Sequence, residues 1–228
     1  FLIEDDCHSL NTNKKIMNNY SDVIFSSLRK ILMKSYSGGI LSINSKVNNE
    51  FFKKIKLKKY KINLKVKINN FLENNLLSFK RFLKFKFLNM PNFSKLNSIK
   101  NEKIYKDFLI DDLSKKIFLK DKFIETKKIR IKNYMIWEKL CKKNKSIEII
   151  KRKLNKSSIP WVFPVYVKNI QTRKKIFRFG WEKGYSIISW PTLPANLVNK
   201  RNKKIWNKLV CFNTDRAPSF RNLNFDNK

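Results

Sequence analysis

The first forty residues contain the stretches Phe1-Leu2-Ile3-Glu4-Asp5-Asp6-Cys7-His8 and Val23-Ile24-Phe25-Ser26-Ser27-Leu28-Arg29-Lys30, followed by the pair Gly38-Gly39. Each of the two stretches opens with an apolar run typical of a strand and ends in polar side chains. Carboxylates follow the first run, and hydroxyls, an Arg and a Lys follow the second. Open α/β sheets bind ligands at the carboxyl ends of their strands, so these polar groups are candidates for a binding site.

The same residues resemble the cofactor region of pyridoxal 5'-phosphate (PLP)-dependent nucleotide-sugar aminotransferases of the DegT/DnrJ/StrS type, which have fold type I. The similarity lies in Ile3-Glu4-Asp5-x-x-His8, in the Phe25–Lys30 segment and in the Gly-Gly pair that follows. In that family the Asp bonds the pyridinium nitrogen, a Gln or His shortly after it lies beside the cofactor, and the Lys binds the cofactor covalently. The resemblance therefore implies that Asp5, His8 and Lys30 hold PLP.

PLP chemistry calls for these residue types independently of the family. An amine must hold the cofactor and move a proton, and a carboxylate must keep the ring nitrogen protonated. Hydroxyls such as those of Ser26 and Ser27 can donate hydrogen bonds to the cofactor phosphate, and the sequence does not rank the two. The Gly38-Gly39 pair permits a tight turn where a side chain would obstruct it.

Ordinary structural roles compete with each of these assignments. The chain has 52 Lys and Arg residues, and most lysines in proteins are solvated surface charges. Asp5 and Asp6 are also suited to a helix N-cap or a turn, and His8 is suited to packing or capping. The combination of residues, rather than any one of them, favours the cofactor site.

The length and composition predict a globular protein of one or two domains. A chain of 228 residues with 42% apolar and 14% aromatic residues can bury a sizeable core. From the resemblance we expect an α/β fold in which residues 1–125 form the second half of a PLP-transferase-like, three-layer large domain, with a Lys/Asn/Ile-rich middle. Residues 126–228 are expected to form a small α+β domain. Because Phe1 lies inside an apolar run typical of a buried strand, we also expect a fragment or a truncated reading frame.

A net charge of +35 ordinarily indicates a nucleic-acid partner. Here Lys, Asn, Ile and Phe are abundant together, as adenine- and thymine-rich codons produce, and the bias is concentrated between Glu50 and Lys156. Nucleic-acid binding or an assembly role without catalysis is the alternative function, since aromatic residues between lysines can stack on bases. A decaying gene whose product does nothing is a third possibility.

The few cysteines and the single histidine limit the disulfides, metal sites and catalytic triads that the chain can form. Cys7, Cys141 and Cys211 are widely spaced and odd in number, which indicates no disulfide framework and a reducing, cytoplasmic setting. The single histidine rules out a His-rich metal site and leaves only His8 for a Ser-His-Asp triad. No apolar run approaches the roughly 18 residues of a membrane helix. We therefore expect neither a metal nor a membrane. From the resemblance we expect a homodimer with an amino-acid donor and a keto-sugar acceptor.

Periodicity predicts the elements of the middle and the second half of the chain. Apolar and aromatic residues recur at helical spacing from Phe123 to Cys141, and Tyr134 and Trp137 are expected in the core. Asp111-Asp112 is expected to cap a new segment. The remaining predicted elements are a strand over residues 38–44, helices over about residues 70–88, a strand over residues 159–167, a helix ending at Lys183, a turn at Gly184, and strands over residues 185–190 and 209–213.

The second half also resembles the aminotransferases. The run Arg130-Ile131-Lys132-Asn133-Tyr134 resembles the Arg-x-x-Asn-Tyr helix that leads into the family's small domain. The run from Trp190 to Pro194 resembles the Pro-rich end that borders the active-site mouth. All four glycines lie in segments that carry the resemblance, and we expect the turns in those segments to need a positive φ; the glycines are Gly38, Gly39, Gly180 and Gly184.

Overall fold

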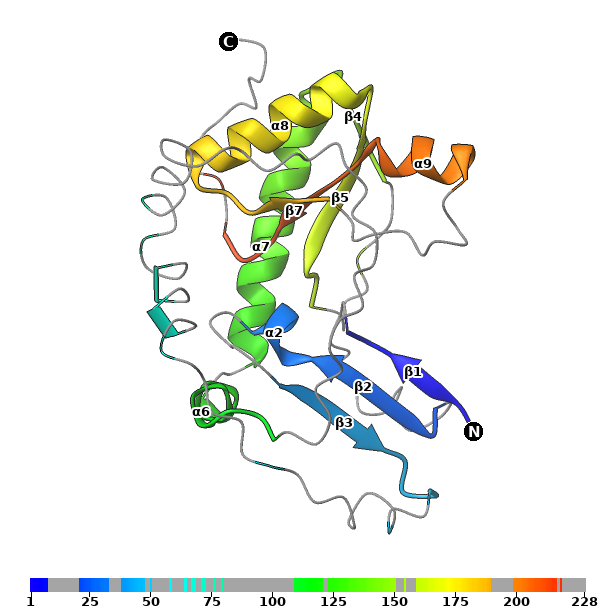
Figure 1. The fold of residues 1–228 in the computed structure, drawn as a ribbon, viewed down its shortest axis with the longest axis vertical. Helices are drawn as coiled ribbons and strands as arrows, with labels where there is room; N and C mark the ends of the chain where they lie inside the picture. Colours follow the sequence, from blue (N-terminus) through cyan, green and yellow to red (C-terminus); the bar gives the residue numbers. More distant parts are fainter. Residues whose placement is uncertain are drawn as a thin grey trace. The chain divides into compact units, whose positions relative to one another are not determined.

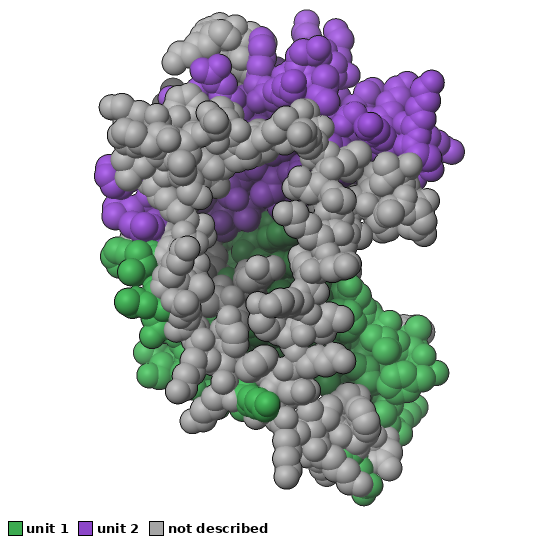
Figure 2. All heavy atoms as spheres, in the orientation of Figure 1, with its two compact units in different colours: residues 1–71, 104–131, 153–161 green, residues 72–103, 132–152, 162–228 purple. Residues whose placement is uncertain are grey.

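The computed structural model divides the chain into two compact units, shown in green and purple in Figure 2. Unit 1 comprises Phe1–Phe71, Ile104–Ile131 and Lys153–Trp161, and unit 2 comprises Leu72–Lys103, Lys132–Arg152 and Val162–Lys228. The structure describes residues 1–7, 21–32, 38–47, 50, 58, 64, 67–68, 71–72, 76, 79, 109–120, 123–150, 154, 159–189, 199–216 and 218. The predicted helices over residues 70–88 lie for the most part outside the described residues. Both units contain helices and strands, so the chain is a mixed α/β protein.

Unit 1 contains a three-stranded sheet in the order β1-β2-β3 (Figure 1). Strand β1 (Ile3–Asp5) is parallel to β2 (Val23–Ser27), and β3 (Gly39–Ile43) is antiparallel to β2. The short helix α2 (Leu28–Ile31) follows β2 directly. These strands confirm the two apolar runs and the strand after Gly38 as sheet elements, although the first strand continues through Glu4 and Asp5 instead of ending before them.

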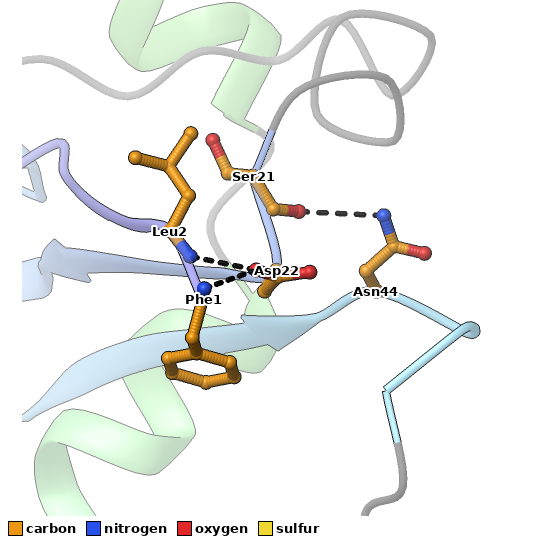
Figure 3. Close-up of polar contacts among 5 residues, drawn as sticks. All are labelled: Phe1, Leu2, Ser21, Asp22 and Asn44. Atoms are coloured by element: carbon orange, nitrogen blue, oxygen red, sulfur yellow. Dashed lines mark hydrogen bonds and ion pairs between the residues drawn. The ribbon is translucent and has the colours of Figure 1, made fainter.

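Asp22 sets the register between β1 and β2. Its Oδ2 accepts the main-chain N–H of Leu2 at 2.6 Å and lies 3.9 Å from the amino group of Phe1 (Figure 3). The carbonyl of Leu2 in turn accepts the N–H groups of Asp22 and Val23 at 3.0 and 3.2 Å. These bonds start the ladder in which Ile3 pairs with Val23.

The first apolar run is largely exposed. Phe1, Leu2 and Ile3 are 83%, 53% and 57% exposed. The physical reason is the position of β1 at the edge of the sheet, where it pairs with β2 alone among the described strands. An edge strand keeps one row of peptide groups and much of its side-chain surface in contact with solvent.

Each of the two glycine-containing segments has a glycine with a positive φ, as predicted. Gly38 has φ 95° and Gly184 has φ 76°. Gly39 and Gly180 are needed for space instead, because a Cβ on Gly39 would lie 2.8 Å from the carbonyl oxygen of Ser26, and one on Gly180 would lie 2.6 Å from Ile187. Close approach of neighbouring elements is therefore the second reason for glycine in this chain.

The core of unit 1 forms around α2. Ile31 and Ile159 are fully buried and pack together, with Ile40 of β3 beside them. Helix α6 (Asp112–Lys120) begins as predicted, because Asp111 Oδ1 accepts the N–H of Ser114 at 2.8 Å and so caps the helix.

Unit 2 contains a four-stranded antiparallel sheet in the order β4-β5-β7-β6. Helix α8 separates β5 from β6, and α9 precedes β7 along the chain (Figure 1). The described helices and strands that lie wholly or partly in unit 2 are α7 (Phe123–Lys142), β4 (Ile147–Ile149), β5 (Val162–Val167), α8 (Ile170–Lys183), β6 (Ile187–Ile188), α9 (Lys200–Trp206) and β7 (Leu209–Asn213). Residues 123–131 of α7 belong to unit 1, and residues 132–142 belong to unit 2.

Aromatic side chains form the core of unit 2. Trp137 stacks on Phe212 with ring centroids 4.5 Å apart, and its Nε1 donates to the carbonyl of Asn213 at 3.1 Å. Tyr134 meets Phe163 edge to face at 4.8 Å. Such pairs contribute about 0.5–1.5 kcal/mol each beyond their buried area. The prediction that Tyr134 and Trp137 lie in the core is confirmed.

Candidate functional site

The candidate site lies at the carboxyl ends of the parallel pair β1 and β2. Asp5 is the last residue of β1, Ser27 is the last residue of β2, and Lys30 follows in α2. The chain remains beside β2 after Asp5, because the N–H of Asp6 donates to the carbonyl of Phe25 at 2.9 Å. Parallel pairing therefore brings Asp5, Ser27 and Lys30 to one edge of the sheet.

The register of the sheet separates the two serine candidates. Asp5 pairs with Phe25, and side chains alternate between faces along a strand, so Asp5, Phe25 and Ser27 share one face. Ser26 lies on the opposite face with Ile24, and both are buried at 4% exposure. Ser27 is half-buried and its hydroxyl makes no capping bond to α2. Ser27 is thus the serine on the face that carries Asp5.

Cys7 lies within reach of both Asp5 and Lys30. The Cys7 amide donates to Asp5 Oδ1 at 2.9 Å, which orients that carboxylate. Burial, a hydrogen bond to Asp5 and the charges of Asp5 and Asp6 raise the pKa of the Cys7 thiol to about 11, while the ammonium of Lys30 acts in the opposite direction. The carboxylate and the ammonium therefore act in opposite directions on the pKa of the same thiol.

Lys30 is half-buried beside an aromatic ring. Its Nζ lies 5.3 Å from the centroid of the Trp161 ring, within cation–π range. Its main-chain carbonyl accepts a hydrogen bond from Arg130 Nη2 at 3.1 Å. The lysine is therefore held through its backbone as well as through its side chain.

Arg130 is the side chain that holds this neighbourhood together. It is 3% exposed, and besides Lys30 it bonds the carbonyl of Ile31 through Nε at 2.9 Å and that of Trp161 through Nη1 at 3.3 Å. A guanidinium offers five donors in a planar fork, so one residue can serve carbonyls from two segments. Arg130 was expected only in the helix that leads into the small domain, and its contacts with these carbonyls were not predicted. The signal in the sequence is a single Arg between two isoleucines in a lysine-rich segment.

The other predicted site residue, His8, lies outside the described residues. Among the residues that the structure does describe, no group of three His, Cys, Asp or Glu side chains is arranged to hold a metal ion. Within the same part of the chain, no helix combines the length and apolar character that a membrane crossing needs. All three cysteines are free thiols.

The alternative function concerns the basic surface. In α9 the side chains of Lys200, Arg201, Lys203 and Lys204 are exposed. Five large aromatic residues of unit 2 are buried, so their rings are not available to bases; they are Trp137, Phe163, Phe177, Trp206 and Phe212. The basic helix offers charge, and these rings offer no stacking platform.

No protein-family model matches the chain, and no curated protein matches it in sequence at a significant level.

Proposed function

We propose that the chain acts as a PLP-dependent aminotransferase, which moves an amino group from an amino-acid donor to a keto sugar. The observation that supports the proposal is the parallel pairing of β1 with β2, because β1 ends at Asp5 beside β2, and β2 leads directly into the helix that carries Lys30. The resemblance of these residues to the DegT/DnrJ/StrS aminotransferases supports it, and extends it to a homodimer with a PLP-transferase-like large domain.

The residues present fit PLP at three points. Asp5 offers a carboxylate, oriented by the Cys7 amide, for the ring nitrogen. Lys30 offers an amine on the neighbouring element, and Ser27 offers a hydroxyl for the phosphate on the same face as Asp5. Helix α2 has only four residues, so its dipole adds little to phosphate binding.

Each residue then has a defined role. PLP, when bound, supplies an electron sink for carbanion chemistry. Asp5 holds the proton on the ring nitrogen, and Lys30 Nζ anchors the cofactor and moves a proton to and from the donor's α carbon. The donor leaves as a keto acid, and the amino group ends on the acceptor carbon. Three free thiols suit the proposed cytoplasmic setting, because reducing compartments keep cysteines unpaired.

PLP capture by the purified chain tests the proposal. The chain is mixed with less than one equivalent of PLP, the visible absorbance is recorded, and borohydride fixes the cofactor for peptide mass spectrometry. We expect the adduct on Lys30 and, with an amino donor, release of the keto acid. Lys30→Ala should lose both but change stability by no more than about 1 kcal/mol, the size of a partly exposed cation–π contact.

The matched control is Lys116→Ala, which removes an exposed lysine of α6 in the same unit. It should capture PLP on Lys30 as the unmodified chain does. Adducts spread over exposed lysines, and unchanged in Lys30→Ala, would reject the cofactor site.

Nucleic-acid binding is the second candidate, favoured by the exposed basic residues of α9. Its test is the affinity for single-stranded RNA measured over a series of salt concentrations. If α9 contacts phosphates, Lys203→Ala should weaken binding and reduce the salt slope by about one unit. Arg178→Ala is the control, because Arg178 already pairs with Glu182 at 2.9 Å. An affinity independent of salt would reject this candidate.

A further inference from the structure

Helix α2 is too short to be stable by itself. It has four residues, and within it the N–H of Leu32 donates to the carbonyl of Leu28 at 2.8 Å. Isolated helices below about 12 residues are marginal in water, because one hydrogen bond does not repay the ordering of a turn. The last carbonyls of any helix also lack partners within the helix. Lys30 is thus carried by an element that requires support from outside.

Arg130 supplies that support at the end of α2. Its Nη2 and Nε bond the carbonyls of Lys30 and Ile31, which are two of the carbonyls left over by the helix. Both bonds are charge-assisted and lie in a site where Arg130 is 3% exposed, so water competes weakly for them. One of the two acceptors is the carbonyl of Lys30 itself. The position of the Lys30 backbone therefore depends directly on the Arg130 guanidinium.

The third bond of Arg130 fixes the surroundings of the Lys30 side chain. Nη1 bonds the carbonyl of Trp161, and the Trp161 ring lies 5.3 Å from Lys30 Nζ. Ile159, in the same segment, packs on Ile31. One side chain thus orients the backbone of Lys30 and the ring against which its amine rests.

We infer that Arg130 is a positioning residue for Lys30, which holds the amine at the edge of the sheet by joining α2 to the Ile159–Trp161 segment. The inference that this position serves PLP rests on the proposed function. A lysine cannot replace Arg130, because its single ammonium offers no planar fork for three carbonyls. Misplacement of a reacting group by about 1 Å can lower a rate by about a hundredfold.

The experiment compares Arg130→Lys and Arg130→Met with Lys128→Met, which removes an exposed basic residue of the same helix. Hydrogen exchange at the Leu32 amide is measured against the Val210 amide, in the core of unit 2. We also measure the acetylation rate of Lys30 relative to Lys116, and the share of captured PLP found on Lys30. The first two readouts need no cofactor.

In both Arg130 variants we expect Leu32 exchange to be about tenfold to a hundredfold faster, with Val210 unchanged. Lys30 acetylation relative to Lys116 should change, and the share of PLP on Lys30 should fall. Lys128→Met should match the unmodified chain. If Arg130→Met does not fold, the measurements on Arg130→Lys test the inference alone, because that variant retains a cation in the site.

Equal acceleration at Leu32 and Val210, or no change at either, would overturn the inference, since the first outcome is a general loss of stability. The two proposals also fail separately. Should the unmodified chain fail to capture PLP on Lys30 while the exchange and acetylation effects appear, the cofactor assignment is wrong and the positioning role stands.

Discussion

Asp5 stands opposite Phe25 in the parallel ladder of β1 and β2, and this pairing puts its carboxylate on the face of the sheet that also carries Ser27. Asp6, the next residue, falls outside the strand. The two neighbouring carboxylates, which the sequence alone hardly distinguishes, therefore differ in their relation to the sheet.

Asp5→Asn should retain PLP but lose amino transfer by about a hundredfold, because an amide cannot hold the ring nitrogen protonated. Asp6→Asn is the matched control and should remain active. The rate of keto-acid release from the amino donor measures both. A damaging Asp6→Asn with a harmless Asp5→Asn would show that the register of the assignment is off by one residue.

Ser27→Ala should weaken PLP affinity by about tenfold to a hundredfold, because one hydrogen bond to a charged phosphate is lost. Ser26→Ala should leave that affinity nearly unchanged, because Ser26 is buried on the other face. Titration of the visible absorbance with PLP gives both constants. The reverse order of effects would assign the phosphate to the opposite face of the sheet.

Asp22→Ala should lower the free energy of unfolding of unit 1 by about 1 kcal/mol, because the Leu2 N–H loses its side-chain acceptor. Asp22→Asn keeps an acceptor oxygen and should cost less. Urea titration measures the change in the free energy of unfolding. Hydrogen exchange at the Val23 amide, which donates to the carbonyl of Leu2, measures the local effect. If the strand slips by one residue, Asp5 moves to the other face and PLP capture is lost as well; unchanged exchange at Val23 in Asp22→Ala would show that the register does not depend on Asp22.

The alkylation of Cys7 should depend on pH with a midpoint near its pKa of about 11, since the thiolate is the reactive form. Asp5→Asn should move the midpoint to lower pH, because the hydrogen bond and the charge of Asp5 both raise this pKa. Asp6→Asn should move it less, since Asp6 is the smallest contributor. Iodoacetamide rates at pH values on both sides of this midpoint, followed by mass spectrometry, test this prediction. An unchanged midpoint in Asp5→Asn would show that the Asp5 carboxylate does not act on the thiol.

Sequence periodicity predicted the long elements well. The helix beginning at Phe123, the helix ending at Lys183, the turn at Gly184 and the strand Leu209–Asn213 all appear in the structure. These segments carry a clear pattern of apolar residues or a glycine with an unusual φ. The predicted strand over residues 185–190 is shorter, at Ile187–Ile188, because its neighbouring strand β7 pairs with only two of its residues.

Features that depend on distant contacts could not be predicted. Arg130 is 100 residues from Lys30 along the chain, and no local pattern reveals that its fork meets the end of α2. The space that requires glycine at positions 39 and 180 is likewise set by neighbours from other elements.

The discontinuous composition of unit 1 has a consequence for synthesis on the ribosome. Ile31 meets its core partner Ile159 only after residue 159 has been made, and the carbonyls at the end of α2 gain their hydrogen-bond donors only with Arg130. At about 5–20 residues per second, the nascent β1, β2 and β3 remain without these partners for roughly ten seconds. During that interval the emerging strands expose apolar surface to water, and a holdase that shields such surface would determine how much of the newly made chain reaches the folded state.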